Sequence, residues 1–363
     1  AIEIHRLLAN HFQSQWEQSG APADIYAAAF QYSLAGSKSS GQTVALTLEA
    51  AEVAAARGDS HEGVRFSRAV LDGPGCTDDE RVRAFIALLM AEGEFPSSRA
   101  PNSESVSSAI DFLGSGPHVE TAHAQVLRAR ISLRLQDSGR LDQAQDIAER
   151  VLGNDASPSH AKRLAGHVVG RTGLLKLREL DLPVADAQEL RGSSVEALDT
   201  ACKPVASSRD DQVQLARLLN TLGDVLSWGG HGLPRDARAL KAYDSSIKLK
   251  EKLGDRHGVA LSLGGIGRFY LYGPSQQLLL NAEVAVDAFE RNLEISNDLE
   301  DLQGRLQIPN QLGELLLKLG QPVEALKRIE ESLHLARCLK DSTSQAFALS
   351  NRTSALVDLG RLD

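Results

Sequence analysis

Glycine, lysine and serine residues between positions 36 and 41 form the first pattern that suggests chemistry. The segment reads Gly36-Ser-Lys-Ser-Ser-Gly41, a composition whose backbone amides could surround a phosphate group. A phosphate-binding loop, however, has the order Gly-x-x-x-x-Gly-Lys-Ser/Thr and follows a β-strand. Lys38 follows Ser37 instead of a glycine, and no strand-like alternation precedes it. We therefore interpret the segment as a turn between helices.

A second glycine-rich pattern, Gly264-Gly-Ile-Gly267, suggests a dinucleotide site. Such a site needs its glycines between a strand and a helix, whereas this pattern lies inside a segment with helical periodicity. Each glycine inside a helix costs about 1 kcal/mol relative to alanine, so a compensating role is expected. Gly264 and Gly265 either open space for the backbone of a ligand or admit a neighbouring side chain.

Histidines and carboxylates do not form the patterns of hydrolases or metal sites. His5 and His11, like His118 and His123, are not four residues apart, and neither His-Glu-x-x-His nor Gly-x-Ser-x-Gly occurs. Adjacent carboxylates are expected to be solvated or to cap helices, namely Asp210-Asp211 and Glu330-Glu331. We therefore predict that the chain is not an enzyme and holds neither a cofactor nor a metal ion.

Composition excludes several classes of partner and location. The 363 residues carry a net charge of −9, and no run of Lys or Arg forms a basic stripe, so nucleic acid is not an expected partner. No apolar run is long enough for a membrane helix, and the N-terminus lacks the pattern of a signal peptide. Three widely spaced cysteines argue against disulfides and zinc and favour a cytoplasmic location: Cys76, Cys202 and Cys338.

An internal repeat is the strongest structural pattern. Three blocks end on an aspartate in the same frame: Lys241–Asp255, Val286–Asp301 and Lys327–Asp341. Counted from Asp211, the aspartates are 44, 46 and 40 residues apart, and each is placed to cap the helix that follows. Large residues coincide at Tyr243, Phe289 and Ile329, and glycines at Gly223, Gly267 and Gly313. A period of this length predicts stacked helical hairpins, and no strand is expected.

Periodicity and turn residues divide the chain into three parts. We expect a helical hairpin over 1–41, irregular helical repeats over 42–209, and regular repeats over 210–363 with the last one truncated. Because the chain begins without Met and ends within a repeat, we also expect it to be part of a longer polypeptide. Gly192 and Pro204 interrupt the segment before residue 209, where we expect a kink or a change of register.

The regular part resembles the tetratricopeptide repeat (TPR) family in a long form. The first helix of that family carries Leu-Gly or a similar pair, which matches Leu222-Gly223, Ile266-Gly267 and Leu312-Gly313. Its second helix carries alanine with a large residue four positions later, which matches Ala239/Tyr243, Ala285/Phe289 and Ala325/Ile329. The resemblance implies an all-α fold, a right-handed α-solenoid of stacked antiparallel helix hairpins, and the binding of proteins or peptides.

The N-terminal part resembles the helical region that follows the nucleotide-switch module in STAND-type regulators. The residues that carry this resemblance are His5–Phe12, Ile25–Gly36 and Ala50–Asp59. In such regulators the repeat array acts as a sensor or as an autoinhibitory arm. The resemblance therefore implies a regulatory arm of a larger signalling protein.

The TPR resemblance also implies which residues line a binding groove, because fixed positions of each first helix face the ligand. These positions hold Arg217, Asn220, Asp224, Ser227, Trp228, Leu261, Gly264, Arg268, Leu271, Tyr272, Gln307, Asn310, Glu314, Leu317 and Lys318, with Asn351 in the last repeat. Asparagine side chains can bond a peptide backbone through both donor and acceptor. Trp228, Arg268 and Tyr272 are candidate anchors, although the two aromatic residues could instead cap the turns after their helices.

Two other classes of function stay open. The array could have a purely architectural role, in self-association or in holding a neighbouring domain inactive. It could also be a segment of a multidomain enzyme whose catalytic domain lies outside this chain.

Overall fold

The structure is a computed structural model that describes residues 2–35, 41–93, 103–114, 121–206 and 208–361. Within these ranges it contains eighteen helices and no strand, which confirms the predicted all-α fold of stacked antiparallel hairpins. Contacts between Cα atoms divide the chain into two compact units, Ala1–Thr172 and Gly173–Asp363. The segment from Gly36 to Ser40, which includes Lys38, lies outside the described residues, as does His118.

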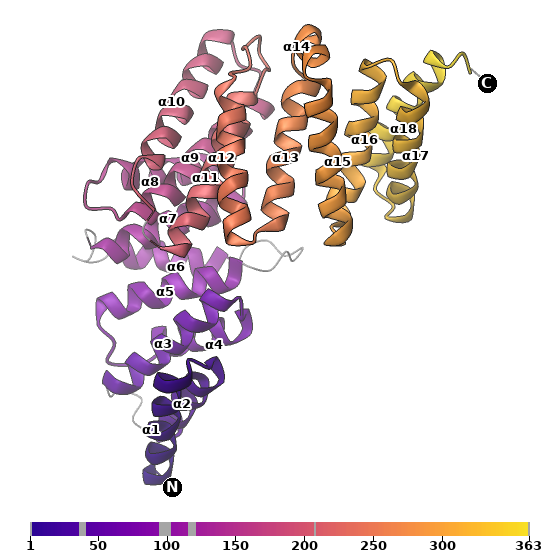
Figure 1. The fold of residues 1–363 in the computed structure, drawn as a ribbon. Helices are drawn as coiled ribbons and strands as arrows, with labels where there is room; N and C mark the ends of the chain where they lie inside the picture. The colour runs from indigo at the N-terminus through magenta and orange to yellow at the C-terminus, as the bar shows by residue number, and fades with distance from the viewer. Residues whose placement is uncertain (1, 36–40, 94–102, 115–120, 207, 362–363) are drawn as a thin grey trace. The chain divides into compact units, whose positions relative to one another are not determined.

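The first unit is built from short helical hairpins (Figure 1). Its helices are α1 (Ile2–Ser19), α2 (Pro22–Leu34), α3 (Gly41–Arg57), α4 (Ser60–Leu71), α5 (Asp78–Gly93), α6 (Ser103–Gly114), α7 (Ala122–Asp137) and α8 (Leu141–Gly153). Helix α9 (Ser159–Glu179) runs across the division between the units. Alanine-rich faces let α1 to α5 approach closely, around a core that includes Ile25, Tyr32 and Phe66.

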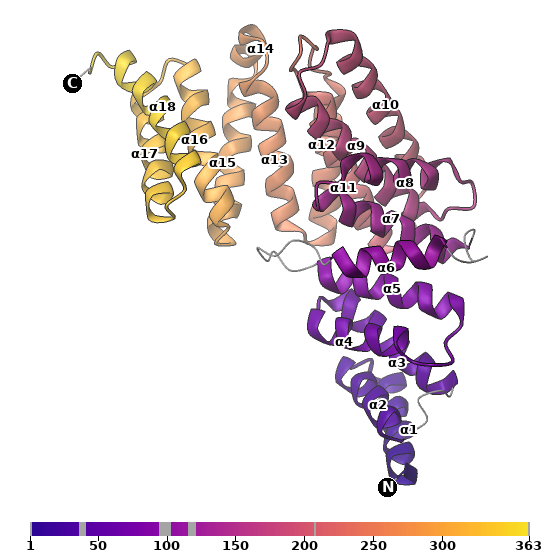
Figure 2. The same cartoon turned by 180° about the vertical axis from the view of Figure 1, so that it is seen from behind.

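The second unit contains the sequence repeats. Its helices are α10 (Val184–Cys202), α11 (Arg209–Ser227), α12 (Arg238–Leu253), α13 (Arg256–Leu271), α14 (Ser275–Leu280), α15 (Ala282–Asp298), α16 (Leu302–Lys318), α17 (Pro322–Cys338) and α18 (Ser342–Asp358). Three hairpins pair α11 with α12, α13 with α15, and α16 with α17. The short helix α14 is inserted between α13 and α15, as Figure 2 shows from behind.

The turns that lead into α13, α16 and α18 share one backbone form. The residue before each capping aspartate is left-handed, with φ of 76° at Gly254, 53° at Glu300 and 55° at Lys340. The aspartate then accepts hydrogen bonds from free N–H groups of the next helix, at Asp255, Asp301 and Asp341. The prediction that Asp211 is a cap is wrong, because it is the third residue of α11 and the hydroxyl of Ser208 caps that helix.

The repeated glycines serve close packing between the paired helices. A Cβ atom at Gly223 would lie 2.6 Å from the ring of Tyr243, and one at Gly267 would lie 2.6 Å from the ring of Phe289. Gly265 touches the other side of the Tyr243 ring. Of the two roles left open for this glycine, the structure therefore shows that it admits a neighbouring side chain.

A polar contact recurs inside each hairpin and fixes its register. The hydroxyl of Ser246 donates to the carbonyl of Ala216 at 2.8 Å. The equivalent pairs, 46 and then 40 residues later on the second helix, are Asn292 to Ala260 at 2.6 Å and Ser332 to Leu306 at 2.7 Å. All three donors are buried. Each donor uses the second lone pair of a helical carbonyl oxygen, and a shifted register would leave the buried donor unpaired.

Helix α10 differs from the kinked segment that the sequence suggests. It continues through Gly192 without interruption and ends at Cys202, two residues before Pro204. Lys203, the residue before Pro204, still has helical dihedral angles, but proline has no N–H group with which to continue the helical hydrogen bonds, so the break falls between Cys202 and Arg209. The three-part division at residues 41 and 209 stays a prediction.

Candidate binding groove

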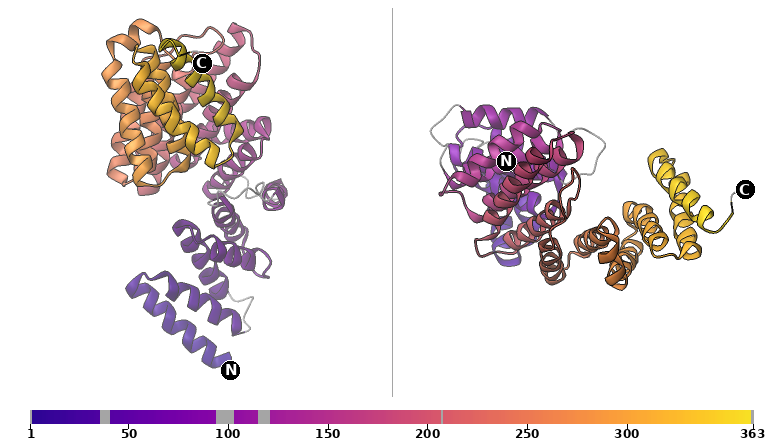
Figure 3. Two further views of the ribbon diagram at one scale, coloured as in Figure 1. Left: turned by 90° about the vertical axis from the view of Figure 1, so that its right-hand side faces the viewer. Right: turned by 90° about the horizontal axis from the view of Figure 1, so that it is seen from above.

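Four helices form one layer of the second unit. Helix α11 contacts α13, α13 contacts α16, and α16 contacts α18, while α12, α15 and α17 each pair with a helix of this layer. Figure 3 (right) looks along the orange helices and shows how they succeed one another. We call the exposed side of α11, α13, α16 and α18 the groove face. Every groove position that the TPR resemblance implies is on these helices or at their C-terminal ends.

A cavity of about 400 Å³ opens on the groove face between α13, α16 and α18. Five of the predicted residues line it, namely Tyr272, Gln307, Asn310, Glu314 and Asn351. The structure thus brings together residues from three different helices, up to 79 positions apart (351 − 272), in a single recess. The other side chains that line it are mostly hydroxyl-bearing or amide-bearing: Gln311, Ser332, Thr343, Ser344 and Ser350, with Leu306 and Phe347.

Carboxamides dominate the floor of this cavity. The amide of Asn351 donates to the carbonyl oxygen of Asn310 at 3.2 Å, which joins α18 to α16. Among the described residues, the buried Oε1 of Gln311 has no hydrogen-bond partner. An unpaired buried acceptor is costly, so a ligand N–H group that reached this oxygen after the Gln311 side chain turned toward the cavity would recover the lost hydrogen bond.

Tyr272 closes the cavity on the side of α13. Its hydroxyl donates to Glu314 at 3.3 Å, and the ammonium group of Lys318 lies 5.5 Å from the centre of its ring. Lys318 also donates to the carbonyl of Leu271 at 2.9 Å. Burial and the nearby charge of Glu314 raise the pKa of Tyr272 to about 12. The ring is still 45% exposed, so it can contact a ligand while α16 holds it in place.

A polar cluster lies at the other end of the groove face, between α11, α12 and α13. The amide of Asn220 donates to Asp224 at 3.0 Å, and the hydroxyl of Tyr243 donates to the other carboxylate oxygen at 2.8 Å. Ser262 donates to the oxygen of Asn220 at 2.7 Å. Burial raises the pKa of Asp224, and the positive charge of Arg268 partly offsets this effect.

Lys250 completes this cluster, and the sequence analysis did not select it. Its ammonium group donates to the carbonyl of Gly258 at 2.9 Å and to the hydroxyl of Ser262 at 3.0 Å. Burial is the main reason why its pKa falls to about 8. The repeat frame contained a signal, because the equivalent positions 46 and 86 residues later hold the small residues Ser296 and Ala336.

The guanidinium groups of Arg217 and Arg268 lie near this cluster without a carboxylate partner. In the described part of the chain, neither group forms an ion pair or a side-chain hydrogen bond. Arg268 folds back along α13, so that its Nη1 lies 3.1 Å from where a Cβ atom of residue 264 would be. The space beside Gly264 is therefore filled by Arg268 and Asn292 rather than left open.

Of the candidate anchors, neither Trp228 nor Arg268 lines the cavity, and Trp228 packs into a hydrophobic cluster instead. It forms the C-terminal cap of α11 and packs against Leu177, Ala187 and Leu233. Arg178 lies over its ring at 5.6 Å. This placement matches the turn-capping alternative, and a binding role for Trp228 stays a prediction.

Four residues of α18 line the cavity although the sequence does not single them out, namely Thr343, Ser344, Phe347 and Ser350. Phe347 and Ser350 stand 40 positions after Gln307 and Asn310, which is the last repeat spacing. Extending that spacing by one step would have found both. Phe347 is 65% exposed, so it offers an apolar surface at the rim.

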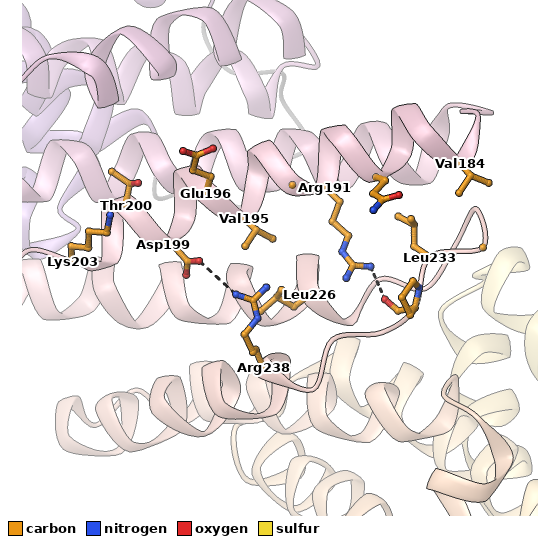
Figure 4. Close-up of a pocket in the computed structure, with 14 residues that line it drawn as sticks. Val184, Arg191, Val195, Glu196, Asp199, Thr200, Lys203, Leu226, Leu233 and Arg238 are labelled. Carbon is orange, nitrogen blue, oxygen red and sulfur yellow. Dashed lines mark hydrogen bonds and ion pairs between the residues drawn. The ribbon is translucent and has the colours of Figure 1, made fainter.

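A larger cavity, about 730 Å³, lies between α10, α11 and the loop before α12. Figure 4 shows Asp199 and Arg238 pointing toward each other across it, 3.9 Å apart. Arg191 donates to the carbonyl of Pro234 at 2.7 Å and so holds the loop against α10. Its charged groups are mostly paired within the protein, so we assign this cavity to packing rather than to a ligand.

The described residues contain no group of three or more His, Cys, Asp or Glu side chains that could hold a metal ion. None of the helices described here has the length and apolar character needed to cross a membrane.

Comparisons with known proteins give a fold and no family. No family model matches the chain, and no curated protein matches its sequence. The solved structure of the apo form of RapI is similar over 86% of this chain and 86% of its own, with 12% identity and a TM-score of 0.57. The chaperone Acl4 of RpL4 aligns over 78% of this chain and 96% of its own, at 15% identity and a TM-score of 0.47. A TPR repeat-containing protein from Cytophaga hutchinsonii aligns over 83% and 98%, at 8% identity and a TM-score of 0.42. The likeness to RapI supports a helical-repeat fold of the kind that the sequence predicts.

Proposed function

We propose that this chain is a non-catalytic scaffold that binds an extended peptide along its groove face. The observation that carries the proposal is the cavity where Asn310, Asn351 and Gln311 present carboxamides from two adjacent helices. A carboxamide offers both a donor and an acceptor, the pair of groups that a peptide backbone requires. Backbone hydrogen bonds of this kind hold a peptide without selecting its sequence.

The two rims of the cavity supply apolar contacts for peptide side chains. Tyr272 and Phe347 are the large exposed rings that line it, on α13 and α18. Aromatic residues with limited rotational freedom contribute strongly to recognition.

We also propose that the chain is a cytoplasmic sensor arm of a STAND-type signalling protein. This proposal is supported by the sequence resemblance of the N-terminal part.

A random array of eight-residue peptides tests the peptide-binding proposal. The Asn310→Ala/Asn351→Ala variant should bind the selected peptides about tenfold more weakly, because each peptide loses hydrogen bonds of about 1 kcal/mol. Binding is measured by fluorescence anisotropy, and circular dichroism checks the fold. The matched control is Gln276→Ala/Asn297→Ala, which removes two exposed carboxamides elsewhere on the second unit. Equal loss in both variants, or no binding peptide at all, would contradict the proposal.

An architectural role is the second candidate, and the first unit favours it. Helix α1 buries only Ala9, while Ile4, Leu7 and Leu8 are 60%, 62% and 39% exposed. Three apolar residues at helical spacing form a stripe that another surface could cover. Sedimentation of the Leu7→Glu variant tests this role: a species that the wild type forms and the variant does not would support self-association.

A further inference from the structure

Positive charge gathers around Asp224 on α11, although the whole chain is acidic. Arg178, Arg217, Lys250 and Arg268 come from four helices, α9, α11, α12 and α13. Three of these charges, on Arg268, Arg178 and Lys250, are close enough to Asp224 to lower its pKa, which burial raises. The fourth, on Arg217, lowers the pKa of Lys250 in addition to the larger effect of burial. We call these four residues the basic cluster.

Among the described residues, Asp224 is the carboxylate on which three charges of the basic cluster act. Asp224 already accepts hydrogen bonds from Asn220 and Tyr243 on both of its oxygens. Asp255 also acts on Lys250 electrostatically, but its carboxylate caps α13 by accepting the N–H of Gly258 at 2.8 Å. Glu314 lies beyond Tyr272 and is occupied by Tyr272 and Lys318. The cluster therefore holds an excess of positive charge with no internal partner among these carboxylates.

The guanidinium groups of the cluster have free hydrogen-bonding capacity. Among the described residues, Arg178 has only its contact with the Trp228 ring, and Arg217 and Arg268 form no ion pair. Arg178 and Arg217 are exposed and Arg268 is partly buried, so a ligand can reach them. Guanidinium groups bind carboxylates through two parallel N–H bonds, and partial burial strengthens such bonds.

The three arginines are spread over successive helices. The charges of Arg178 and Arg268 meet at the level of Asp224, whereas Arg217 lies seven residues earlier on α11, about 10 Å along the helix axis, so a single carboxylate does not pair with all three guanidinium groups at once. Several carboxylates along an extended peptide can do so. This spacing favours acidic side chains over the single carboxylate at a peptide C-terminus.

We propose that the basic cluster selects peptides with consecutive acidic side chains, which lie on Arg178, Arg217 and Arg268. This inference rests on the proposed function and names the chemistry of its ligand. The acidic part of the peptide lies along α9, α11 and α13, and its neutral part enters the cavity between α13, α16 and α18. The basic cluster thus supplies specificity, and the carboxamides supply backbone hydrogen bonds.

Two peptide probes with the same fluorophore and an amidated C-terminus test the inference: hexaglutamate and hexaglutamine. Hexaglutamate should bind at least about tenfold more tightly, because charge-assisted hydrogen bonds are roughly twice as strong as neutral ones. The triple variant Arg178→Gln/Arg217→Gln/Arg268→Gln should remove this preference. The triple variant Lys241→Gln/Lys248→Gln/Lys252→Gln loses the same charge on the exposed side of α12 and should retain the preference.

A gain of affinity provides a second readout that unfolding cannot imitate. Asp224→Asn removes the carboxylate on which three charges of the cluster act, so hexaglutamate should bind several-fold more tightly while hexaglutamine is unaffected. Equal binding of the two probes, or equal losses in the two triple variants, would overturn the inference. So would tight binding that requires a free C-terminus or that inorganic phosphate alone reproduces.

The outcomes separate the inference from the proposed function. If array peptides bind through Asn310 and Asn351 but show no enrichment in Asp and Glu, the inference is wrong and the scaffold function stands. If hexaglutamate binds at the arginines but no array peptide depends on Asn310 and Asn351, the assignment of the cavity is wrong and the basic cluster stands.

Discussion

Lys250 is buried where most proteins place an apolar side chain. It is 2% exposed, and only neutral oxygens accept its hydrogen bonds. Transfer of a charged ammonium group out of water is costly unless an opposite charge is close by. This cost explains why its pKa falls to about 8 from the ordinary value of 10.5.

The lowered pKa of Lys250 makes the free energy of unfolding depend on pH. Below pH 8 Lys250 is protonated in both the folded and the unfolded chain, and the folded chain bears the full cost of burying that charge. Between pH 8 and 10.5 the unfolded chain binds more protons than the folded one, so stability rises with pH. From pH 7 to 9.5 this amounts to about 2 kcal/mol.

Urea unfolding at pH 7 and pH 9.5 checks this dependence. The wild type should gain about 2 kcal/mol more than the Lys250→Met variant over this interval, because methionine does not titrate. Staying below pH 10 avoids the tyrosines, whose raised pKa values act in the opposite direction. Identical pH profiles for the two proteins would show that the ammonium group is not buried.

At the residue scale, the repeat frame selects side chains that lie together in the structure, but it does not show which neighbours a side chain packs against. Gln307, Asn310 and Glu314 follow from the repeat frame, and all three line one cavity. Trp228 occupies a frame position as well, yet the chain after α11 turns so that its ring packs on Leu177 and Leu233. Turn capping is the alternative that the sequence offers for Trp228, but the sequence does not show which side chains the ring packs against.

Helix pairing in the second unit depends on glycines opposite large side chains. At Gly267 a methyl group would lie 2.6 Å from the Phe289 ring, a distance that real Cβ atoms do not adopt. Gly192 on α10 has no atom within 4 Å of the same position. Gly267 is thus tightly packed against a neighbouring side chain, whereas Gly192 has open space beside it, although both lie inside helices.

Substitution of these two glycines by alanine should change stability in opposite directions. Gly267→Ala should lower the free energy of unfolding by about 1–3 kcal/mol, because the ring cannot move away within a packed hairpin. Gly192→Ala should raise it by about 0.5–1 kcal/mol, because alanine favours the helix and meets no neighbour. Denaturant unfolding measures both. A Gly267→Ala variant as stable as Gly192→Ala would contradict the packing role, and Phe289→Leu should partly rescue the former.

Most elements follow from local sequence, since caps and apolar periodicity act over a few residues. Asp255, Asp301 and Asp341 begin helices as expected. The continuity of α10 through Gly192 was not predictable, because Leu198 and Ala201 are fully buried and such tertiary packing outweighs a propensity cost of about 1 kcal/mol.

Each unit of the whole molecule is a stack in which a hairpin contacts mainly its neighbours. Stability in such a stack is a sum of local terms, so its ends should open before its middle. In the first unit α1 buries one residue, and in the second unit α18 buries two, Ala348 and Ala355. Helix α13 buries eleven residues.

Hydrogen–deuterium exchange by mass spectrometry should therefore show a gradient. Amides of α18 should exchange at least about tenfold faster than those of α13, and amides of α1 faster than those of α3, because end helices open by local unfolding. Peptides from α12 serve as an internal reference for the slow limit. Uniform protection from α11 to α18 would indicate one cooperative unit instead of a stack.

The shared backbone form of the turns has a consequence for how such an array can change in length. The hairpin from Asp255 to Glu300 lies between two equivalent junctions, and the polar contact that sets its register, Asn292 to Ala260, is internal. Excision of residues 255–300 would join Gly254 to Asp301, again a left-handed residue followed by a capping aspartate. The hairpin is in this sense bounded by matching junctions. Arg268 would leave with it while Glu314 would remain, so duplication or loss of this hairpin would change the charge pattern of the groove. Gly265 and Ser262 would leave as well, so the neighbouring helix α12 would have to repack around Tyr243 and Lys250.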